Sequence, residues 1–316
     1  MNAPLIEATG LTKEYRLASG KKVHAVSDVS LQIFRGETLG LVGESGCGKS
    51  TLGRALIGLN PPTSGEVRFE GAPVTGLGER AFRAYRRRMQ MIFQDPYASL
   101  DPRMTVQEIV AEPLKTYKVC KTREELSARV GALLDAVGIP REYRDRYPHQ
   151  FSGGQRQRVG IARAIALDPD LIVCDEPVSA LDVSVQNQIL NLLKSLQRER
   201  GLTYLFISHD LSVVRFLSDR VCVMFLGSLC ELGDTAGVYE NPLHPYTRFL
   251  LDAIPKPDPR TRGEERMLLS GDLPSPINPP GGCRFHTRCP YATDRCRTEA
   301  PHLREVSGRL VACHRA

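Results

Sequence analysis

A glycine-rich stretch that carries a lysine and two hydroxyl side chains has the residue types and spacing to bind phosphate groups. It consists of Gly43, Glu44, Ser45, Gly46, Cys47, Gly48, Lys49, Ser50 and Thr51. A strand-like apolar run at residues 38–42 precedes it, and a helix-like run follows at residues 51–57. Glycines let successive backbone amides face one centre, and the start of a helix adds positive partial charge there. Lys49 can reach the β and γ phosphates and Ser50 can ligate Mg²⁺, so the full pattern favours a nucleoside triphosphate site over an ordinary glycine-rich turn.

Two adjacent carboxylates form a second group of side chains that could take part in a reaction. Asp175 and Glu176 end the strand-like apolar run at residues 171–174. Ligands collect at the carboxyl ends of the strands in open α/β sheets. We therefore expect Asp175 to hold Mg²⁺ and Glu176 to polarise an attacking water as general base. Two exposed acids that cap the next helix would be the simpler interpretation if the phosphate loop were absent.

The elements that position these groups read as an α/β fold. Residues 5–10, 30–34 and 66–70 are β-rich and predict an antiparallel subsheet. From residue 38 onward, strand-like runs alternate with helix-like runs, which is typical of a parallel sheet with crossover helices. Helix-like runs at residues 105–114 and 123–137 interrupt this alternation. The expected parallel strands are residues 39–42, 89–93, 171–174 and 204–207.

Composition argues against several other classes of protein. Of the 316 residues, 41% are apolar, enough for a sizeable core. No apolar run is long enough to span a bilayer, and no signal-peptide pattern opens the chain. Nine cysteines, an odd number, fit a reducing compartment better than a disulfide framework. The net charge is +6, and the arginine cluster at residues 83–88 reads as a solvated helix face, because no aromatic platform accompanies it.

Four further motifs lie between the phosphate loop and residue 210, and a tyrosine precedes them all. They read Phe-Gln-Asp-Pro, Phe-Ser-Gly-Gly-Gln, Ser-Ala-Leu-Asp and Ile-Ser-His-Asp. In kind and in order they resemble the Q-loop, signature, D-loop and switch of ABC-type ATPases, over roughly the first 250 residues of the chain. The residues that carry the resemblance are Gln94, Ser152, Gly153, Gly154, Gln155, Asp182 and His209, together with Tyr15.

The resemblance implies a role for each of these residues. His209 would sense the γ-phosphate, and the Tyr15 ring would stack on adenine. The signature residues and Asp182 would close over ATP that a second ATPase subunit holds, since Ser-Gly-Gly-Gln offers a further helix N-terminus to an anion. The residues implied in hydrolysis are Glu176, His209, Lys49 and Gln94, and those implied at Mg²⁺ are Ser50, Gln94 and Asp175. The residues implied at ATP are those of the phosphate loop with Tyr15, Gln94, Asp175 and His209.

Longer runs narrow the resemblance to one subfamily. Residues 147–155, 176–186, 241–248 and 268–276 resemble the ATPases of dipeptide, oligopeptide and nickel importers. The chain is most similar to the second, F-type, ATPase subunit of bacterial dipeptide importers. This resemblance implies ATP hydrolysis coupled to peptide import, but it leaves the transported substrate open.

The same resemblance implies partners and a location. The expected partners are a sister ABC ATPase subunit in a homo- or heterodimer, two transmembrane permease subunits and an extracytoplasmic peptide-binding protein, with no nucleic acid. The expected location is peripheral, on the cytoplasmic face of the inner membrane. The alternative is a soluble ABC ATPase that acts on nucleic acid or ribosomes. Such proteins usually carry two cassettes in one chain or long heptad-bearing inserts, and this sequence has neither.

The implied architecture is the α/β fold of a P-loop NTPase of the ABC ATPase type. It combines an antiparallel β subdomain, a mostly parallel core sheet and a helical subdomain at about residues 95–165 with a small Cys-rich C-terminal module. We place the domain boundary near Ile254, where the sequence becomes proline-rich and typical of a stiff, irregular linker. The predicted domains are an ABC ATPase domain at residues 1–254, and a Pro-rich linker with a Cys-rich metal-binding module at residues 255–316.

Four cysteines gather in this tail. Five, six and sixteen residues separate Cys283, Cys289, Cys296 and Cys313. Four thiols in a segment with no expected core of its own suggest a metal staple, and all-sulfur coordination suits zinc or an iron–sulfur cluster. The spacings are wider than the paired Cys-x₂-Cys of zinc ribbons, and the resemblance also implies a [4Fe-4S] cluster. Zinc and four unligated thiols remain the alternatives.

Cys47 differs from the other cysteines because it lies inside the phosphate loop, close to the start of a predicted helix. A helix N-terminus favours the thiolate form of a cysteine. The sequence therefore predicts that thiol alkylation blocks ATP binding and that ATP protects Cys47.

Overall fold

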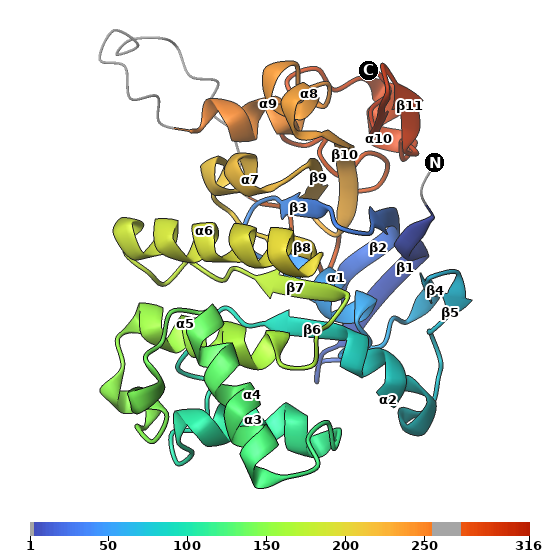
Figure 1. The fold of residues 1–316 in the computed structure, drawn as a ribbon. Helices are drawn as coiled ribbons and strands as arrows, with labels where there is room; N and C mark the ends of the chain where they lie inside the picture. The colour runs from blue at the N-terminus through green and yellow to red at the C-terminus, as the bar shows by residue number, and fades with distance from the viewer. Residues whose placement is uncertain (1–2, 255–272) are drawn as a thin grey trace, which may run out of the picture. The chain divides into compact units, whose positions relative to one another are not determined.

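The computed structural model of the chain describes residues 3–254 and 273–316 (Figure 1). Contacts between residues divide it into two compact units. The first unit comprises Met1–Ile33, Thr38–Thr75 and Ser208–Ala316, and the second comprises Phe34–Glu37 and Gly76–Ile207. The proline-rich run that begins at residue 255 and the tail motif at residues 268–272 lie outside the described residues. The division into domains at residues 1–254 and 255–316 stays a prediction.

The first unit contains the antiparallel subsheet that the sequence predicts. Its strands are β1 (Pro4–Arg16), β2 (Lys22–Phe34), β4 (Ser64–Phe69) and β5 (Ala72–Pro73). They lie in the order β2-β1-β4-β5, and β1 runs antiparallel to β4 with Ile6 opposite Phe69. β1 and β2 are longer than the predicted β-rich runs.

A second set of strands in this unit leads to the phosphate loop. β3 (Thr38–Val42) pairs in parallel with β9 (Arg220–Phe225), and β9 pairs antiparallel with β10 (Ser228–Asp234). All five residues of β3 are buried, as expected of a strand covered on both faces. The helices of the unit are α1 (Lys49–Leu56), α7 (Leu211–Leu217), α8 (Thr235–Glu240), α9 (Pro245–Asp252) and α10 (Asp294–Thr298).

The C-terminal tail continues this sheet, which the sequence analysis did not anticipate. β12 (Arg309–Val311) pairs antiparallel with β10, and β11 (Arg304–Val306) pairs antiparallel with β12 (Figure 1). Val311 is fully buried and Phe285 is 1% exposed. The tail therefore shares the core of the first unit.

A buried ion pair holds the tail to β10. Glu231 is fully buried, and its carboxylate accepts hydrogen bonds from the backbone amides of residues 243–244 and from the Arg309 guanidinium at 3.0 Å. Arg309 also donates to the carbonyl oxygens of Gly237 at 2.7 Å and Asn241 at 2.8 Å. Because every partner is satisfied, the pair links β12, β10 and the segment after α8 without leaving an unpaired charge.

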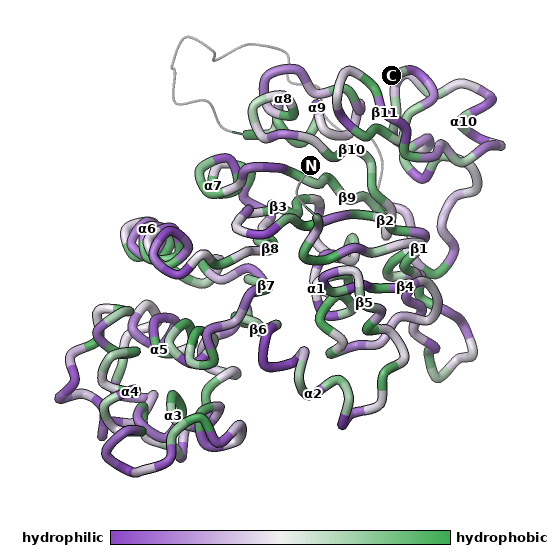
Figure 2. Tube along the Cα trace, turned by 45° about the vertical axis from the view of Figure 1, so that its right-hand side comes forward, coloured by the Kyte–Doolittle hydropathy of each residue, from purple (hydrophilic) through white to green (hydrophobic). Residues whose placement is uncertain are grey.

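The second unit contains three of the four predicted parallel strands. β6 (Met89–Ile92), β7 (Leu171–Asp175) and β8 (Thr203–Ile207) lie in this order, with parallel pairing between neighbours. Helix α2 (Glu79–Arg88) leads into β6, and α6 (Val183–Arg200) connects β7 to β8. Figure 2 shows hydrophilic and hydrophobic residues interleaved along α6, whose buried residues are Ile189, Leu190, Leu193 and Leu196. This spacing is that of an amphipathic helix with one face against a core.

Asp170 connects three segments of the second unit. It precedes β7, and its carboxylate accepts hydrogen bonds from Arg35 and Arg88, each at 2.5 Å. Burial alone would raise the pKa of Asp170, but the hydrogen bonds from the two guanidinium groups outweigh it and hold the pKa below its usual value.

Helices make up the rest of the second unit. They are α3 (Val106–Thr116), α4 (Arg123–Ala136) and α5 (Gly153–Ile165), with the short 3₁₀ turns η1 (Arg141–Tyr143) and η2 (Pro148–Gln150). The three α-helices contact one another, and they lie together in the green part of Figure 1. A capping box between Thr105 and Glu108 begins α3. The predicted helices at residues 105–114 and 123–137 are confirmed.

Within residues 3–254 and 273–316, none of the helices combines the length and the apolar character that crossing a membrane requires.

Candidate functional site

The candidate residues divide between the two units. The first unit holds the phosphate loop, Tyr15, His209 and the four tail cysteines. The second unit holds Gln94, Asp175, Glu176, Asp182 and the signature residues Ser152, Gly153, Gly154 and Gln155.

The phosphate loop connects β3 to α1, as predicted, and two of its glycines are sterically required. Gly43 has φ 151°, and a Cβ there would lie 2.1 Å from the carbonyl oxygen of Met224. Gly48 has φ 105°, and a Cβ there would lie 2.0 Å from the carbonyl oxygen of Ala25. No side chain fits at such distances, so the loop can pack against β2 and β9 only with glycine at both positions.

Lys49 is the first residue of α1 and is 5% exposed. Its ammonium donates to the carbonyl oxygens of Gly43 at 2.8 Å and Glu44 at 3.0 Å. The lysine side chain therefore folds back over its own loop and places its charge at the loop's centre. Ser50 and Thr51 follow in the first turn of α1. A positive charge, loop amides and a hydroxyl at one helix start are the groups that a polyphosphate requires.

Cys47 does not have the environment that the sequence analysis expected. Its side chain is 1% exposed, and burial raises the pKa of the Cys47 thiol, with the nearby Lys49 ammonium opposing this only in part. Desolvation of the thiolate thus outweighs the helix terminus. The prediction of a reactive thiolate at Cys47 is wrong.

Tyr15 and His209 are both accessible. The Tyr15 ring lies near the end of β1 and is 37% exposed, and its hydroxyl accepts a hydrogen bond from Asn60 at 3.3 Å. The Lys13 ammonium lies 5.2 Å from the centre of the Tyr15 ring. His209 is exposed and lies just after β8, one residue before Asp210, which caps α7. Both side chains are therefore exposed on the first unit.

Gln94 and Glu176 come together in the second unit. Ile92 of β6 lies opposite Cys174 of β7, which brings the residues that follow these two strands close to each other. The Gln94 amide donates to the Glu176 carboxylate at 3.1 Å. Glu176 has φ 47°, a left-handed conformation that costs about 1 kcal/mol in a non-glycine residue and often marks functional positions.

Asp175 is the last residue of β7 and is fully buried. Cys174 precedes it within β7, and Glu176 is the first residue after the strand. A buried carboxylate needs a partner of opposite charge or strong hydrogen-bond donors. Its position at the carboxyl end of a parallel strand is the one that the sequence predicts.

The signature residues form the start of α5. Ser152 caps this helix: its hydroxyl accepts from the Gln155 amide at 3.3 Å, and the Gln155 side chain accepts from the Ser152 amide at 3.0 Å. A Cβ at Gly154 would lie 2.3 Å from a methyl carbon of Val185, so glycine permits the close approach of α5 and α6. The signature motif therefore forms a helix N-terminus and also allows α5 to pack closely against α6.

Asp182 caps α6 in the same unit. Its carboxylate accepts from the Ser184 hydroxyl at 2.7 Å and from the Val185 amide at 3.0 Å. These hydrogen bonds, the one from Ser184 first, hold the pKa of Asp182 below its usual value. Asp182 is therefore an anionic group at an exposed helix start.

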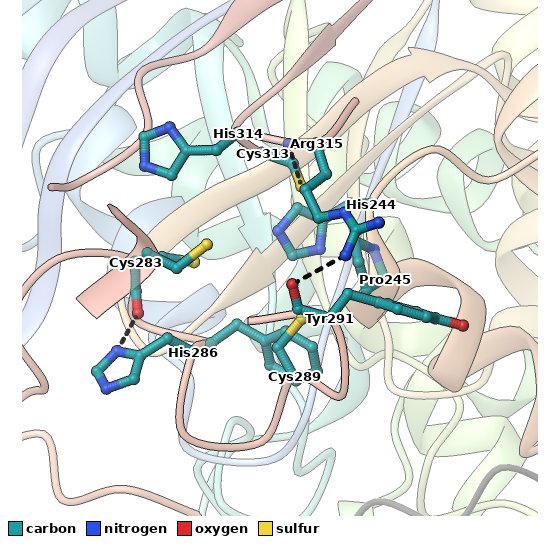
Figure 3. A pocket seen from close by; sticks show the side chains of 11 residues that line it. His244, Pro245, Cys283, His286, Cys289, Tyr291, Cys313, His314 and Arg315 are labelled. Atoms are coloured by element: carbon teal, nitrogen blue, oxygen red, sulfur yellow. Dashed lines mark hydrogen bonds between the residues drawn. The ribbon is translucent and has the colours of Figure 1, made fainter. Parts of the chain in front are cut away.

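The four tail cysteines line one small cavity of about 20 Å³, together with His244, Phe285, His286, Tyr291, His314 and Arg315. Figure 3 labels Cys283, Cys289 and Cys313 among the residues that line it. The Cys283 amide donates to the carbonyl oxygen of Cys296 at 2.8 Å. Burial raises the pKa of Cys283 to about 11, and the other three thiols act in the same direction. The tail thus brings together the thiols that the sequence singles out.

No metal site is evident at this cavity. Among the described parts of the chain, no three or more His, Cys, Asp or Glu side chains are arranged to hold a metal ion. His286 contacts the carbonyl oxygen of Cys283 at 2.8 Å, and His314 contacts that of Glu299 at 2.9 Å. Four thiols are suitable ligands for a metal–sulfur group. In this structure, however, their side chains are not arranged as its coordination shell.

Two contacts of the phosphate loop had no signal in the sequence. The Tyr246 hydroxyl accepts from the Glu44 amide at 2.9 Å, and Arg288 pairs with the Glu44 carboxylate. Tyr246 belongs to the Pro-Leu-His-Pro-Tyr run that we used only as a mark of subfamily. Both residues are about 200 or more positions away from the loop in the sequence. Spacing between residues cannot predict a contact over such a separation.

Comparisons with known proteins identify the family that the chain resembles. Residues 26–179 match the family described as "ABC transporter", and residues 230–296 match "Oligopeptide/dipeptide transporter, C-terminal region". The chain is 54% identical over 313 residues to YkfD of Bacillus subtilis, covering 98% of this chain and 95% of the relative. It is 52% identical over 318 residues to the oligopeptide transport ATP-binding protein OppF of Escherichia coli, with the same coverage.

A solved structure is similar to the chain in fold. It is the dimeric post-hydrolysis state of the ATP-binding cassette MJ0796, bound to ADP and Pi. The TM-score is 0.67 at 32% identity, over 73% of this chain and 98% of the other.

Proposed function

We propose that this chain, which belongs to the ATP-binding proteins of the ABC transporter family, powers the import of dipeptides or oligopeptides across the bacterial inner membrane. Its enzymatic activity is that of an ABC-type ATPase, which converts ATP and water into ADP and phosphate. The observation that carries the proposal is 52% identity to OppF over 98% of the chain, together with the match of residues 230–296 to the oligopeptide/dipeptide transporter C-terminal region. Which peptide is transported is decided by other subunits.

The roles proposed at the ATP site follow the motifs of ABC ATPases. Lys49 and the loop amides would bind the phosphates, while Ser50 and Asp175 would hold Mg²⁺, which supplies charge neutralisation. Glu176 would take a proton from the attacking water. The hydrogen bond from Gln94 supports this role, because it orients the Glu176 carboxylate.

The remaining predicted residues would complete the site. Tyr15 would stack on the base, and His209 would contact the γ-phosphate; the exposure of both side chains supports these roles. The signature residues and Asp182 would act on ATP that a second ATPase subunit holds. The helix N-terminus at Ser152 supports this assignment, and MJ0796, which is similar in fold, is a dimer bound to ADP and Pi.

The test of the catalytic assignment is Glu176→Gln in the full chain, assayed with its membrane partners. The amide keeps the side chain's shape and can still accept from Gln94, but it cannot accept a proton. We expect ATP turnover to fall roughly 10²- to 10⁴-fold while ATP binding is retained. Glu199→Gln on the exposed end of α6 is the matched control and should turn over ATP normally. Near-normal turnover of Glu176→Gln would refute the assignment.

We propose a peripheral location on the cytoplasmic face of the inner membrane. There the chain would assemble with a sister ATPase, two permease subunits and an extracytoplasmic peptide-binding protein. The names of its relatives support this. Affinity purification from detergent-solubilised membranes should recover multi-span membrane proteins with the chain. Recovery of nucleic acid in their place would contradict the proposal and favour the soluble alternative.

We further propose that the tail cysteines hold a [4Fe-4S] cluster, with zinc as the alternative. The convergence of Cys283, Cys289, Cys296 and Cys313 on one cavity supports a thiolate-bound group there. Anaerobically purified protein should be brown and contain iron and acid-labile sulfide. Cys283→Ser should lose the iron, whereas Cys120→Ser, outside the tail, should keep it. A colourless, iron-free and folded preparation would contradict the cluster, and bound zinc would establish the alternative.

A further inference from the structure

The loop between Cys283 and Cys289 makes three contacts with the part of the first unit that surrounds the phosphate loop. Arg284 donates to the carbonyl oxygen of Leu226, at the end of β9. The Phe285 ring packs against the rings of Phe225 and Tyr246, with centroids 5.3 Å apart in both pairs. Arg288 reaches the phosphate loop itself and pairs with Glu44. The segment is thus anchored at its start, its middle and its end.

Glu44 is held at each of its polar groups. Its amide donates to the Tyr246 hydroxyl at 2.9 Å, and its carbonyl oxygen accepts from the Lys49 ammonium at 3.0 Å. Its two carboxylate oxygens accept from one nitrogen of Arg288 at 2.8 and 3.1 Å. Residues from the last quarter of the chain therefore supply the partners of both the Glu44 amide and its carboxylate.

The charge of Glu44 opposes the ligand that its loop would bind. A carboxylate beside a triphosphate site repels the phosphates unless a cation neutralises it. Arg288 is placed to do this, because its side chain is only 8% exposed and that of Glu44 is 26% exposed. Salt screens such a partly buried pair much less than a surface pair.

We propose that Arg288 is a positioning residue for ATP binding: it neutralises Glu44 and turns its carboxylate away from the phosphates. In this way the Cys283–Cys289 loop of the tail sets the affinity of the phosphate loop for nucleotide. The inference rests on the proposed function in so far as the loop binds ATP. It does not require a metal group in the tail.

The test is Arg288→Gln in the full chain, with the Kd for Mg–ATP measured by titration of a fluorescent ATP analogue. We expect the Kd to rise on the order of tenfold, the usual size of coupling between linked sites. In the assembled transporter the KM for ATP should rise by a similar factor, with kcat at saturating ATP nearly unchanged. Arg295→Gln is the matched control, because it breaks an exposed pair with Glu299 in the same tail and should leave both constants unaltered.

The partner variant separates positioning from a general structural effect. In Arg288→Gln/Glu44→Gln the uncompensated charge is gone, so the Kd should return most of the way to that of the parent. Normal ATP affinity in Arg288→Gln, or no rescue by Glu44→Gln, would overturn the inference. If Arg288→Gln fails to fold, Glu44→Gln alone removes the carboxylate that Arg288 neutralises and should leave the Kd at or below that of the parent, and a rise in the Kd would overturn the inference. Failure of the parent chain to bind ATP would instead refute the proposed function.

Discussion

Replacing Arg309 with methionine tests whether the tail is an integral part of the first unit. The change removes the guanidinium from a fully buried Glu231 and from the carbonyl oxygens of Gly237 and Asn241. Breaking one side of a buried ion pair costs about 3–5 kcal/mol, because the remaining charge stays desolvated. Two backbone amides still donate to Glu231, which places the expected loss near the lower end of this range.

Thermal unfolding followed by circular dichroism measures this loss. A shift of about 2–4 °C for each kcal/mol is typical of domains with 150–250 residues, so the Tm of the first unit should fall roughly 6–16 °C for a loss of about 3–4 kcal/mol. Adding Glu231→Gln removes the buried charge, and the double variant should recover more than half of the loss. Arg295→Met, which breaks an exposed ion pair in the same tail, should cost no more than about 1 kcal/mol.

A change in Tm of less than about 1 °C for Arg309→Met would refute the reasoning. It would mean that β11 and β12 contribute nothing to the first unit, and that the tail folds separately, as the sequence analysis assumed. A loss in Arg309→Met that Glu231→Gln does not relieve would show instead that packing of the arginine stem, and not charge, holds the hairpin.

Three further predictions follow from single contacts. Gly48→Ala should raise the Kd for ATP more than roughly tenfold, because the added methyl group would lie 2.0 Å from the Ala25 carbonyl oxygen. The Kd is measured by titration with a fluorescent ATP analogue, and an unchanged Kd would contradict the geometry of the phosphate loop. Asp170→Asn should cost roughly 1–3 kcal/mol at pH 7, and the difference from the parent should vanish as pH falls below about 4. Because folding lowers the pKa of Asp170, its ionised carboxylate stabilises the folded chain above the pKa that it has in the unfolded chain. This stabilisation is lost as the pH falls through the pKa of the folded chain, so a stability difference between Asp170→Asn and the parent that grows in acid would refute the prediction. A maleimide should label Cys47 in the native chain as slowly as the fully buried Cys174, measured by peptide mass spectrometry, and rapid labelling that ATP prevents would restore the original expectation.

Patterns that are local in the chain were predicted well. The phosphate loop, the carboxylates after residue 174 and the helix starts depend on residues a few positions apart, so spacing alone indicates them. The parallel strands β6, β7 and β8 are short apolar runs, as expected for strands that are buried on both faces. The contact between Gln94 and Glu176 was not predicted: each residue comes just after a strand, but only the structure shows that these two strands are neighbours.

Features that depend on residues far apart were missed or misjudged. β11 and β12 are three residues each, too short for a periodic pattern, and they become strands only because β10 offers an edge. The reactivity of Cys47 was misjudged because proximity to a helix start can be read from the sequence, whereas the burial that raises the thiol pKa cannot. The expectation of a metal group in the tail stays a prediction, supported by the convergence of four thiols on one cavity.

By itself, the sequence determined the strand, glycine-rich turn and helix start of the phosphate loop, which form within fewer than twenty consecutive residues, and from them it predicted the residues of a nucleoside triphosphate site. Only the tertiary structure decided that the cysteine tail joins β10 through Arg309 and contacts the phosphate loop through Arg288. The physical reason is that each contact joins residues far apart in the chain. More than 70 residues separate Arg309 from Glu231 and more than 240 separate Arg288 from Glu44, so each ion pair depends on how the intervening chain folds, and no local pattern in the sequence encodes it.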